Sequence, residues 1–277
     1  MAVTTSSSLD DLFVNIIAEA RMSAEENSIM RNLVTNYNIG SVAGTTIQVP
    51  KYSTVSAADL TEGTDMTSTE VTTSSVAIAV GEVGVQAFLT DMAAMGNGNP
   101  AQEIGQLLGN AIARKIDQDL IALFDGFSAS LGGTGVELSV ADIFKAAATL
   151  RNNKVMGNLV AVLNPLQAYA LKANLTNTFA NPNGGDLQNE ALRTGYVGTI
   201  AGVDIYESAH VSIDGSGDAK GAIFAPEALA LAMKRDFVIE PERNASLRGW
   251  ELNATAVYGV GELDDTYGVE MFFDAAI

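Results

Sequence analysis

The sequence predicts an α+β fold in which a long helix and an extended, strand-rich ribbon accompany an α/β unit and a strand-rich C-terminus. Three observations support this prediction. Apolar residues recur at helical spacing over residues 104–124, residues 45–90 are rich in Thr, Val and Ser, and capped helices flank a short apolar strand within residues 131–234. With 277 residues, 47% of them hydrophobic, the chain has enough apolar material for a packed core.

Charge and composition exclude several kinds of site. Asp and Glu number 33 against 15 Lys and Arg, and the net charge of −18 disfavours broad adhesion to nucleic acid or anionic lipid. The absence of cysteine excludes disulfides and thiolate chemistry, and the single histidine excludes a site that needs two imidazoles from one chain. The polar start lacks signal-peptide features and no apolar run could span a membrane, so we expect a soluble, cytoplasmic product with no membrane partner.

The N-terminus is expected to form an arm that contains a helix. Ser8 followed by Asp11 is a helix-start signal. A single apolar stripe follows at helical spacing, formed by Leu9, Leu12, Phe13, Ile16, Ile17 and Ala20. Because no partner helix lies beside it in sequence, the stripe docks either on its own body or on a neighbour, and the sequence leaves both open.

A long hairpin is expected between residues 45 and 90. Residues 45–52 predict one strand, 71–80 and 83–89 predict its return, and 57–65 predict the tip. A two-stranded hairpin alone is marginally stable in water, and this one has few large apolar residues. We therefore expect it to lie against another subunit, with packing on its own domain as the alternative.

The charge pattern of this region limits what it can contact. Between Lys51 and Arg114 the sequence has seven acidic residues and no basic one. Such a run usually forms a solvated face, and acidic strands also repel copies of themselves edge to edge.

The strongest helix signal follows. Asn99, Pro100 and Gln102 supply an N-cap, a first-turn proline and a capping-box partner, and Gly126 is a plausible end. The apolar stripe comprises Ile104, Leu107, Leu108, Ala111, Ile112, Ile116, Leu120 and Phe124. A helix within residues 99–126, with about 26 residues between the cap and Gly126, would be about 39 Å long and would act as a spine.

The rest of the chain is expected to contain an α/β unit and then strands. Helices are expected from Ser139, from a cap at Asn164, and from Pro226 through Ala232. A buried strand is expected at 159–163, and further strands at 203–206, 237–240, 247–258 and 269–273. A mobile loop is expected at 212–221, and a bend at Gly259 and Gly261 between the last two strands.

Motifs for catalysis are largely missing from the sequence. There is no phosphate-binding glycine loop, no His-Glu-x-x-His and no Gly-x-Ser-x-Gly. Asp214, Ser216 and Asp218 match the start of a calcium loop, but Ala219 and Ala225 stand where Gly and Glu are required, so a plain surface loop is expected. A soluble α/β enzyme built on residues 131–234 is the alternative from another functional class, and an activity screen of the free chain would test it.

Several segments, taken in order and spacing, resemble the major capsid proteins of tailed bacteriophages, which have the HK97-like fold. The segments are 44–50, 57–63, 81–91, 104–120 and 195–208. The resemblance covers nearly the whole chain and is weakest in the first 35 residues.

The resemblance implies a domain map. It places an N-terminal arm at 1–40, the first part of a peripheral domain at 41–130 with an extended loop at 46–88 and the spine helix at 99–126, an axial α/β domain at 131–234, a peripheral return at 235–265, and a last strand at 266–277 that rejoins the axial domain.

The residues expected at contacts between subunits lie in the arm, in the tip of the extended loop and in the 212–221 loop. They are Leu12, Phe13, Ile16, Asp59, Leu60, Glu62, Asp65, Asp214, Asp218 and Lys220. The resemblance implies a structural protein rather than an enzyme, with no cofactor and no metal.

The function implied is that of a major capsid protein. Through hexamers and pentamers it would build an icosahedral shell that encloses phage dsDNA without sequence-specific binding, in a virion assembled in the host cytoplasm. Expected partners are copies of itself, a portal, a possible decoration protein and, because no long domain precedes the arm, a separate scaffolding protein. The alternative is an encapsulin-like nanocompartment that encloses protein cargo.

One departure from some family members concerns covalent crosslinking. Those members join a lysine of the extended loop to an asparagine of a neighbour. Here the loop has no lysine beyond Lys51 at its base, so no covalent crosslink at the tip is expected.

Overall fold

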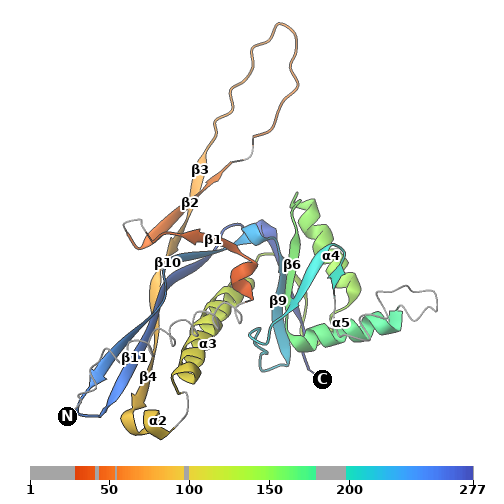
Figure 1. The fold of residues 1–277 in the computed structure, drawn as a ribbon. Helices are drawn as coiled ribbons and strands as arrows, with labels where there is room; N and C mark the ends of the chain where they lie inside the picture. Colours follow the sequence, from red (N-terminus) through yellow and green to blue (C-terminus); the bar gives the residue numbers. More distant parts are fainter. Residues whose placement is uncertain (1–28, 41–43, 54, 97–99, 179–197, 277) are drawn as a thin grey trace.

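The computed structural model describes residues 29–40, 44–53, 55–96, 100–178 and 198–276. These residues form a mixed α and β structure with three sheets (Figure 1). A four-stranded sheet has the order β1-β10-β11-β4, a six-stranded sheet has the order β5-β12-β9-β6-β8-β7, and β2 and β3 form a separate ribbon. The ribbon and the loop that joins its strands project beyond the rest of the fold (Figure 1).

The helices and strands follow one another in a mixed order along the chain. They are η2 (Met30–Asn32), β1 (Thr35–Asn38), β2 (Thr46–Tyr52), β3 (Thr73–Ala79), β4 (Gly81–Thr90), α2 (Asp91–Gly96), α3 (Pro100–Ile121), η3 (Ala122–Gly126), β5 (Ser130–Gly132), α4 (Val140–Asn152), β6 (Leu159–Leu163), α5 (Pro165–Thr178), β7 (Thr199–Ile200), β8 (Val203–Glu207), β9 (Asp218–Phe224), η4 (Pro226–Ala228), β10 (Leu229–Asn244), β11 (Gly249–Glu262), η5 (Asp265–Tyr267) and β12 (Gly268–Asp274).

The four-stranded sheet packs one face against the long helix α3. Strand β11 alternates buried and half-buried residues, and its buried side chains include Leu252 and Ala254. They share a core with Ile112 and Ile116 on the buried stripe of α3. The alternating pattern and the helical stripe therefore meet as complementary apolar surfaces.

The predicted spine helix is confirmed over Pro100–Ile121, while Asn99 lies outside the described residues. Its last predicted turn, Ala122–Gly126, is a 3-10 helix instead. This tighter turn places buried Phe124 with its ring centroid 5.5 Å from that of Phe224. At 1.5 Å per residue the α-helical part is about 33 Å long.

The six-stranded sheet is covered on both faces. All five residues of β6 are buried, as predicted for 159–163. Leu159 and Leu163 pack with α4 residues such as Ile143, whereas Val160 and Val162 join the core shared with α3. A continuous apolar run is the expected sequence of a strand that has no solvated face.

Local capping signals position the helices beside this sheet. Ser139 and Asp142 form the capping box that starts α4. At α5, Asn164 Oδ1 accepts a hydrogen bond from the Leu166 backbone N–H at 2.9 Å. Buried Gln167 accepts from the Asn164 backbone N–H at 3.2 Å and donates to the Ala219 carbonyl at 2.7 Å. Both predicted helix starts are confirmed, and Gln167 additionally ties α5 to β9.

The predicted helix from Pro226 through Ala232 is wrong. Only Pro226–Ala228 forms one 3-10 turn, and strand β10 begins at Leu229. Residues Leu229–Ala232 are fully or almost fully buried between β1 and β11, so they form an apolar run that local pattern cannot distinguish from a small buried helix.

The prediction is wrong for one part of the hairpin and for the bend near the C-terminus. Strands β2 and β3 pair over Thr46–Tyr52 and Thr73–Ala79 as expected, but Gly81–Thr90 leaves the hairpin and pairs with β11. Gly259 and Gly261 do not bend the chain after β11, because both lie within that strand.

Candidate inter-subunit surfaces

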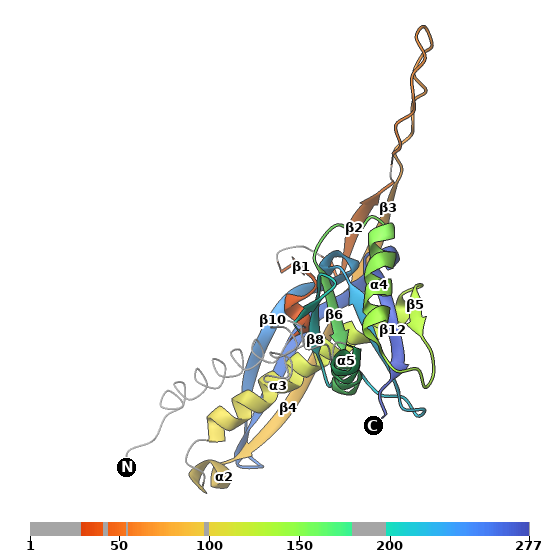
Figure 2. The same cartoon turned by 90° about the vertical axis from the view of Figure 1, so that its right-hand side faces the viewer.

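The loop between β2 and β3 is uncovered in its own chain. We call residues 53–72 the extended loop and residues 57–66 the loop tip. Every described residue of the extended loop is exposed, and both views show it reaching away from the rest of the chain (Figures 1 and 2). Its described hydrogen bonds join Ser53 with Thr72 at its base and Thr61 with Thr64 at the tip.

The loop tip brings together four of the predicted contact residues. Asp59, Leu60, Glu62 and Asp65 are all exposed there. Leu60 is 64% exposed and the neighbouring Met66 is 75% exposed. These exposed apolar side chains beside carboxylates make the loop tip a candidate contact surface.

The base of the ribbon, in contrast, is packed firmly on the four-stranded sheet. Ile78 of β3 is 1% exposed and packs with Ala230 and Ala232 of β10. A Cβ atom at Gly259 would lie 2.3 Å from the Ala79 carbonyl oxygen, and one at Gly261 would lie 2.8 Å from Ile78 Cγ1. Glycine in β11 is therefore required for the ribbon to cross this strand so closely.

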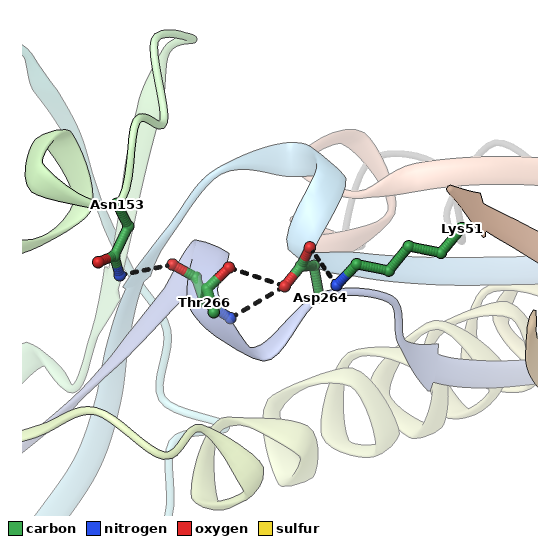
Figure 3. Close-up of polar contacts among 4 residues, drawn as sticks. All are labelled: Lys51, Asn153, Asp264 and Thr266. Atoms are coloured by element: carbon green, nitrogen blue, oxygen red, sulfur yellow. Dashed lines mark hydrogen bonds and ion pairs between the residues drawn. The ribbon is translucent and has the colours of Figure 1, made fainter. Parts of the chain in front are cut away.

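A polar chain extends from the ribbon base toward the six-stranded sheet (Figure 3). Lys51 Nζ lies 2.5 Å from Asp264 Oδ2. Asp264 Oδ1 accepts hydrogen bonds from the Thr266 backbone N–H at 3.1 Å and from its hydroxyl at 2.8 Å. The Thr266 carbonyl accepts a hydrogen bond from Asn153 Nδ2 at 3.0 Å, and Asn153 is the C-cap of α4. The ribbon is thereby linked to α4, the helix that packs on the six-stranded sheet.

The carboxyl groups around this link have opposite pKa shifts. Burial alone would raise the pKa of Asp264, but hydrogen bonds from Lys51 and Thr266 hold it below its usual value. Burial, followed by the charges of Asp265 and Asp264, raises the pKa of Glu262. The cluster therefore has one carboxylate that favours its charged form and one that favours its neutral form.

The predicted mobile loop at 212–221 is shorter than expected, because β9 already begins at Asp218. Asp214 is exposed, and its side chain accepts hydrogen bonds from the Ser216 and Asp218 backbone N–H groups. Asp218 is 1% exposed and accepts a hydrogen bond from the Gly135 backbone N–H at 2.9 Å, so it is buried within its own chain, and a contact with a neighbour there stays a prediction.

Lys220 is engaged within its own chain. Its ammonium group pairs with Asp125 and lies 3.4 Å from Glu270 Oε1. The hydrogen bond to Asp125 raises the pKa of Lys220. This ion pair joins β9 to η3, and sequence reasoning had assigned the lysine only to a contact between subunits.

The predicted contacts Leu12, Phe13 and Ile16 lie outside the described residues. Sequence reasoning missed Asp117, a buried carboxylate on α3. It accepts hydrogen bonds from the backbone N–H groups of Ile29 and Met30 at 3.1 and 3.3 Å, and so holds the start of the described chain on the helix. The available signal was an acidic residue within the buried stripe, four positions from both Ala113 and Ile121.

The described residues contain no cluster of three or more His, Asp or Glu side chains with a metal-binding arrangement. None of the described helices combines the length and the hydropathy that a membrane crossing requires.

Comparison of the sequence with known protein families identifies the family of this chain. A family model described as phage capsid protein matches residues 73–270. The chain belongs to this phage capsid protein family. No curated protein matches this capsid protein in sequence.

Solved phage capsids share the fold. The capsid of the cyanophage P-SCSP1u is 20% identical, with a TM-score of 0.70 over 90% of this chain and 89% of that chain. The Mycobacterium phage Che8 structure is 18% identical, with a TM-score of 0.69 over 88% and 90%. The head structure of Helicobacter pylori bacteriophage KHP40 is 12% identical, with a TM-score of 0.69 over 90% and 92%. The predicted HK97-like capsid fold is confirmed, and the protein is a structural component of a phage shell.

Proposed function

We propose that copies of this capsid protein assemble through hexamers and pentamers into an icosahedral shell that encloses phage dsDNA. The observation that carries this proposal is the extended loop, whose exposed apolar and acidic side chains have no cover in their own chain. Membership of the phage capsid family supplies the partner, namely further copies of the same chain.

Assembly of this kind gains strength from repetition. One loop contact is small, but every subunit makes the contact and also receives one, so modest affinities multiply around a closed shell. The net charge of −18 supports enclosure of DNA without adhesion, because a strongly acidic chain has little affinity for phosphates.

The domain map fits this function. We propose that residues 1–40 act as the arm, 41–130 and 235–265 as the peripheral domain, and 131–234 with 266–277 as the axial domain. Two structural facts support the division: β12 lies in the six-stranded sheet beside β9, and β10 and β11 pair with β4. Asp214, exposed in the turn before β9, would then lie near the capsomer axis.

Further partners follow from the same proposal. A separate scaffolding protein would guide assembly in the host cytoplasm, a portal would occupy one vertex, and a decoration protein would bind the finished virion. We propose no catalytic role. Both the family and the solved neighbours named above are phage capsids, so no finding favours a nanocompartment with protein cargo.

Negative-stain microscopy tests the proposal. The full chain, co-expressed with the scaffolding gene, should yield closed polyhedral particles of uniform size, whereas uniform particles from the chain expressed alone would contradict the proposed scaffolding partner. A matched variant in which residues 55–71 are replaced by Asn-Gly should remain folded by circular dichroism yet form no particles. Particles of normal yield from the loop-deleted chain would contradict the assignment of the loop as an assembly contact.

A further inference from the structure

The extended loop and helix α4 have opposite charge patterns in the sequence. Residues 52–113 contain seven acidic residues and no basic one, whereas residues 143–185 contain four basic residues and no acidic one. The structure exposes part of the first run at the loop tip and part of the second run on α4.

Helix α4 has an outward face that combines basic and apolar side chains. Its inward side chains, including Ile143 and Leu150, are buried against the six-stranded sheet. The helix lies on the flank of the molecule opposite the four-stranded sheet (Figure 1). We call this exposed surface the α4 face: it consists of the helix residues Phe144, Lys145, Ala148 and Arg151, and of Lys154 and Met156 just beyond the end of the helix.

The apolar residues of the α4 face are open to solvent. Phe144 is 55% exposed and Met156 is 82% exposed. Neither Lys145 nor Lys154 forms an ion pair with any described residue, whereas Lys51 and Lys172 pair with carboxylates of their own chain. In a chain with net charge −18, exposed cations without an ion pair among the described residues mark a surface suited to an acidic partner.

The loop tip has the complementary chemistry. Asp59, Glu62 and Asp65 alternate with the exposed apolar residues Leu60 and Met66. Figures 1 and 2 show the tip projecting beyond the fold, away from the α4 of its own chain, so contact between these surfaces requires a second copy.

The dimensions of the two surfaces agree. One arm of the extended loop, about ten residues at 3.3 Å each, spans about 33 Å. The 13 residues of α4 span about 20 Å at 1.5 Å each. One arm is therefore long enough to lie along the whole α4 face.

We propose that the loop tip of one copy docks along the α4 face of a neighbouring copy. Carboxylates of the tip pair there with the basic residues of the α4 face, and the apolar side chains of both surfaces cover one another. This inference rests on the proposed function, because it names the surface that receives the loop within the shell.

Charge reversal tests the pairing directly. Lys145→Glu combined with Lys154→Glu should lower the yield of closed particles by about tenfold or more, because two attractions become repulsions at every contact. Arg114→Glu combined with Arg248→Glu is the matched control, because it changes the charge by the same amount. Arg114 matches Lys145, since both lie on a helix. Arg248 matches Lys154, since both have a positive φ, of 51° and 67°. The control should assemble within about twofold of the unmodified chain.

Rescue separates a specific contact from a general charge effect. Asp59→Lys combined with Glu62→Lys should also abolish assembly, and the chain with all four reversals should recover at least a third of the normal yield. Sedimentation and negative-stain microscopy measure particles, and circular dichroism melting establishes that each variant is folded.

The outcomes distinguish the two proposals. The α4 contact is overturned if the α4 variant assembles normally, if the control loses as much particle yield, or if the four reversals together do not restore yield. None of these outcomes affects the proposed shell function. If the unmodified chain forms no particles under any condition, the proposed function itself fails.

Discussion

The strand β6 and the extended loop show two different ways in which one chain uses its apolar residues. All five side chains of Leu159–Leu163 are buried on both faces of a sheet, whereas no described residue of the loop is buried. Burying a leucine contributes about 1.5–3 kcal/mol to stability. The six-stranded sheet gains this when the monomer folds, and the loop can gain it only when a neighbour covers it.

The largest expected effect tests this contrast directly. Phe224→Ala, at a fully buried position, should lower the free energy of unfolding by about 3–5 kcal/mol in urea titrations. Leu60→Ala, at the exposed tip, should change it by less than about 0.5 kcal/mol and instead lower particle yield. If both changes destabilise the isolated chain equally, the loop is packed on its own body and the comparison fails.

The ribbon base should behave like the core rather than like the tip. Gly259→Ala introduces a Cβ atom 2.3 Å from the Ala79 carbonyl oxygen, so backbone must move, and about 1–3 kcal/mol of stability should be lost. Gly81→Ala is the control, since a Cβ atom there meets nothing within 4 Å. Thermal melting measures both, and similar melting temperatures for the two variants would argue against the close crossing.

Loss of the Lys51–Asp264 ion pair should lower stability by less than the core and ribbon-base substitutions, but by more than the loop-tip substitution. Lys51→Met should cost about 0.5–1 kcal/mol at pH 7, because the lysine is half-exposed. The folded-state pKa of Asp264 is lowered, so this contribution is present above the unfolded value of about 4 and is lost as the pH falls through the folded value. The difference between variant and unmodified chain should therefore shrink on acidification, and a constant difference from pH 7 to pH 2 would contradict the pairing.

Glu262 should show the opposite dependence on pH. Its raised pKa means that its contribution is present below the unfolded pKa and is lost as the pH rises through the folded value. Glu262→Gln should therefore raise the melting temperature slightly at pH 7 and have no effect near pH 3. Destabilisation by this variant at neutral pH would show that the carboxylate has a favourable partner.

For covalent crosslinking at the loop tip, we expect no effect at all. Between Lys51 and Arg114 the chain has no lysine, so shells boiled in detergent should run as a single monomer band on a denaturing gel. A ladder of bonded multimers would mean that residues outside the loop tip form a covalent link.

Sequence reasoning succeeded where the signal is local. The caps at Ser139 and Asn164 and the apolar run at 159–163 each specify their element within a few residues, and the structure agrees. The tip residues were located correctly because Gly and acidic residues break the strand pattern. Whether they contact a neighbour remains a prediction.

The failures have a common physical cause, which is dependence on distant partners. Leu229–Ala232 forms a strand because β1 and β11 flank it, and β4 leaves the hairpin because β11 offers a longer pairing. Asp117 lies in the core, where the distant backbone N–H groups of Ile29 and Met30 donate hydrogen bonds to it. Similarly, the glycines of β11 are explained by a ribbon that lies 180 residues earlier in the chain.

The polar link from Lys51 to Asn153 tethers the ribbon to the end of α4. A pull on the ribbon that shifts Lys51 must either break its ion pair or drag the turn before β12, and that turn is hydrogen-bonded to the end of α4. A force on the ribbon is thus transmitted to the end of α4 through one ion pair and a few hydrogen bonds.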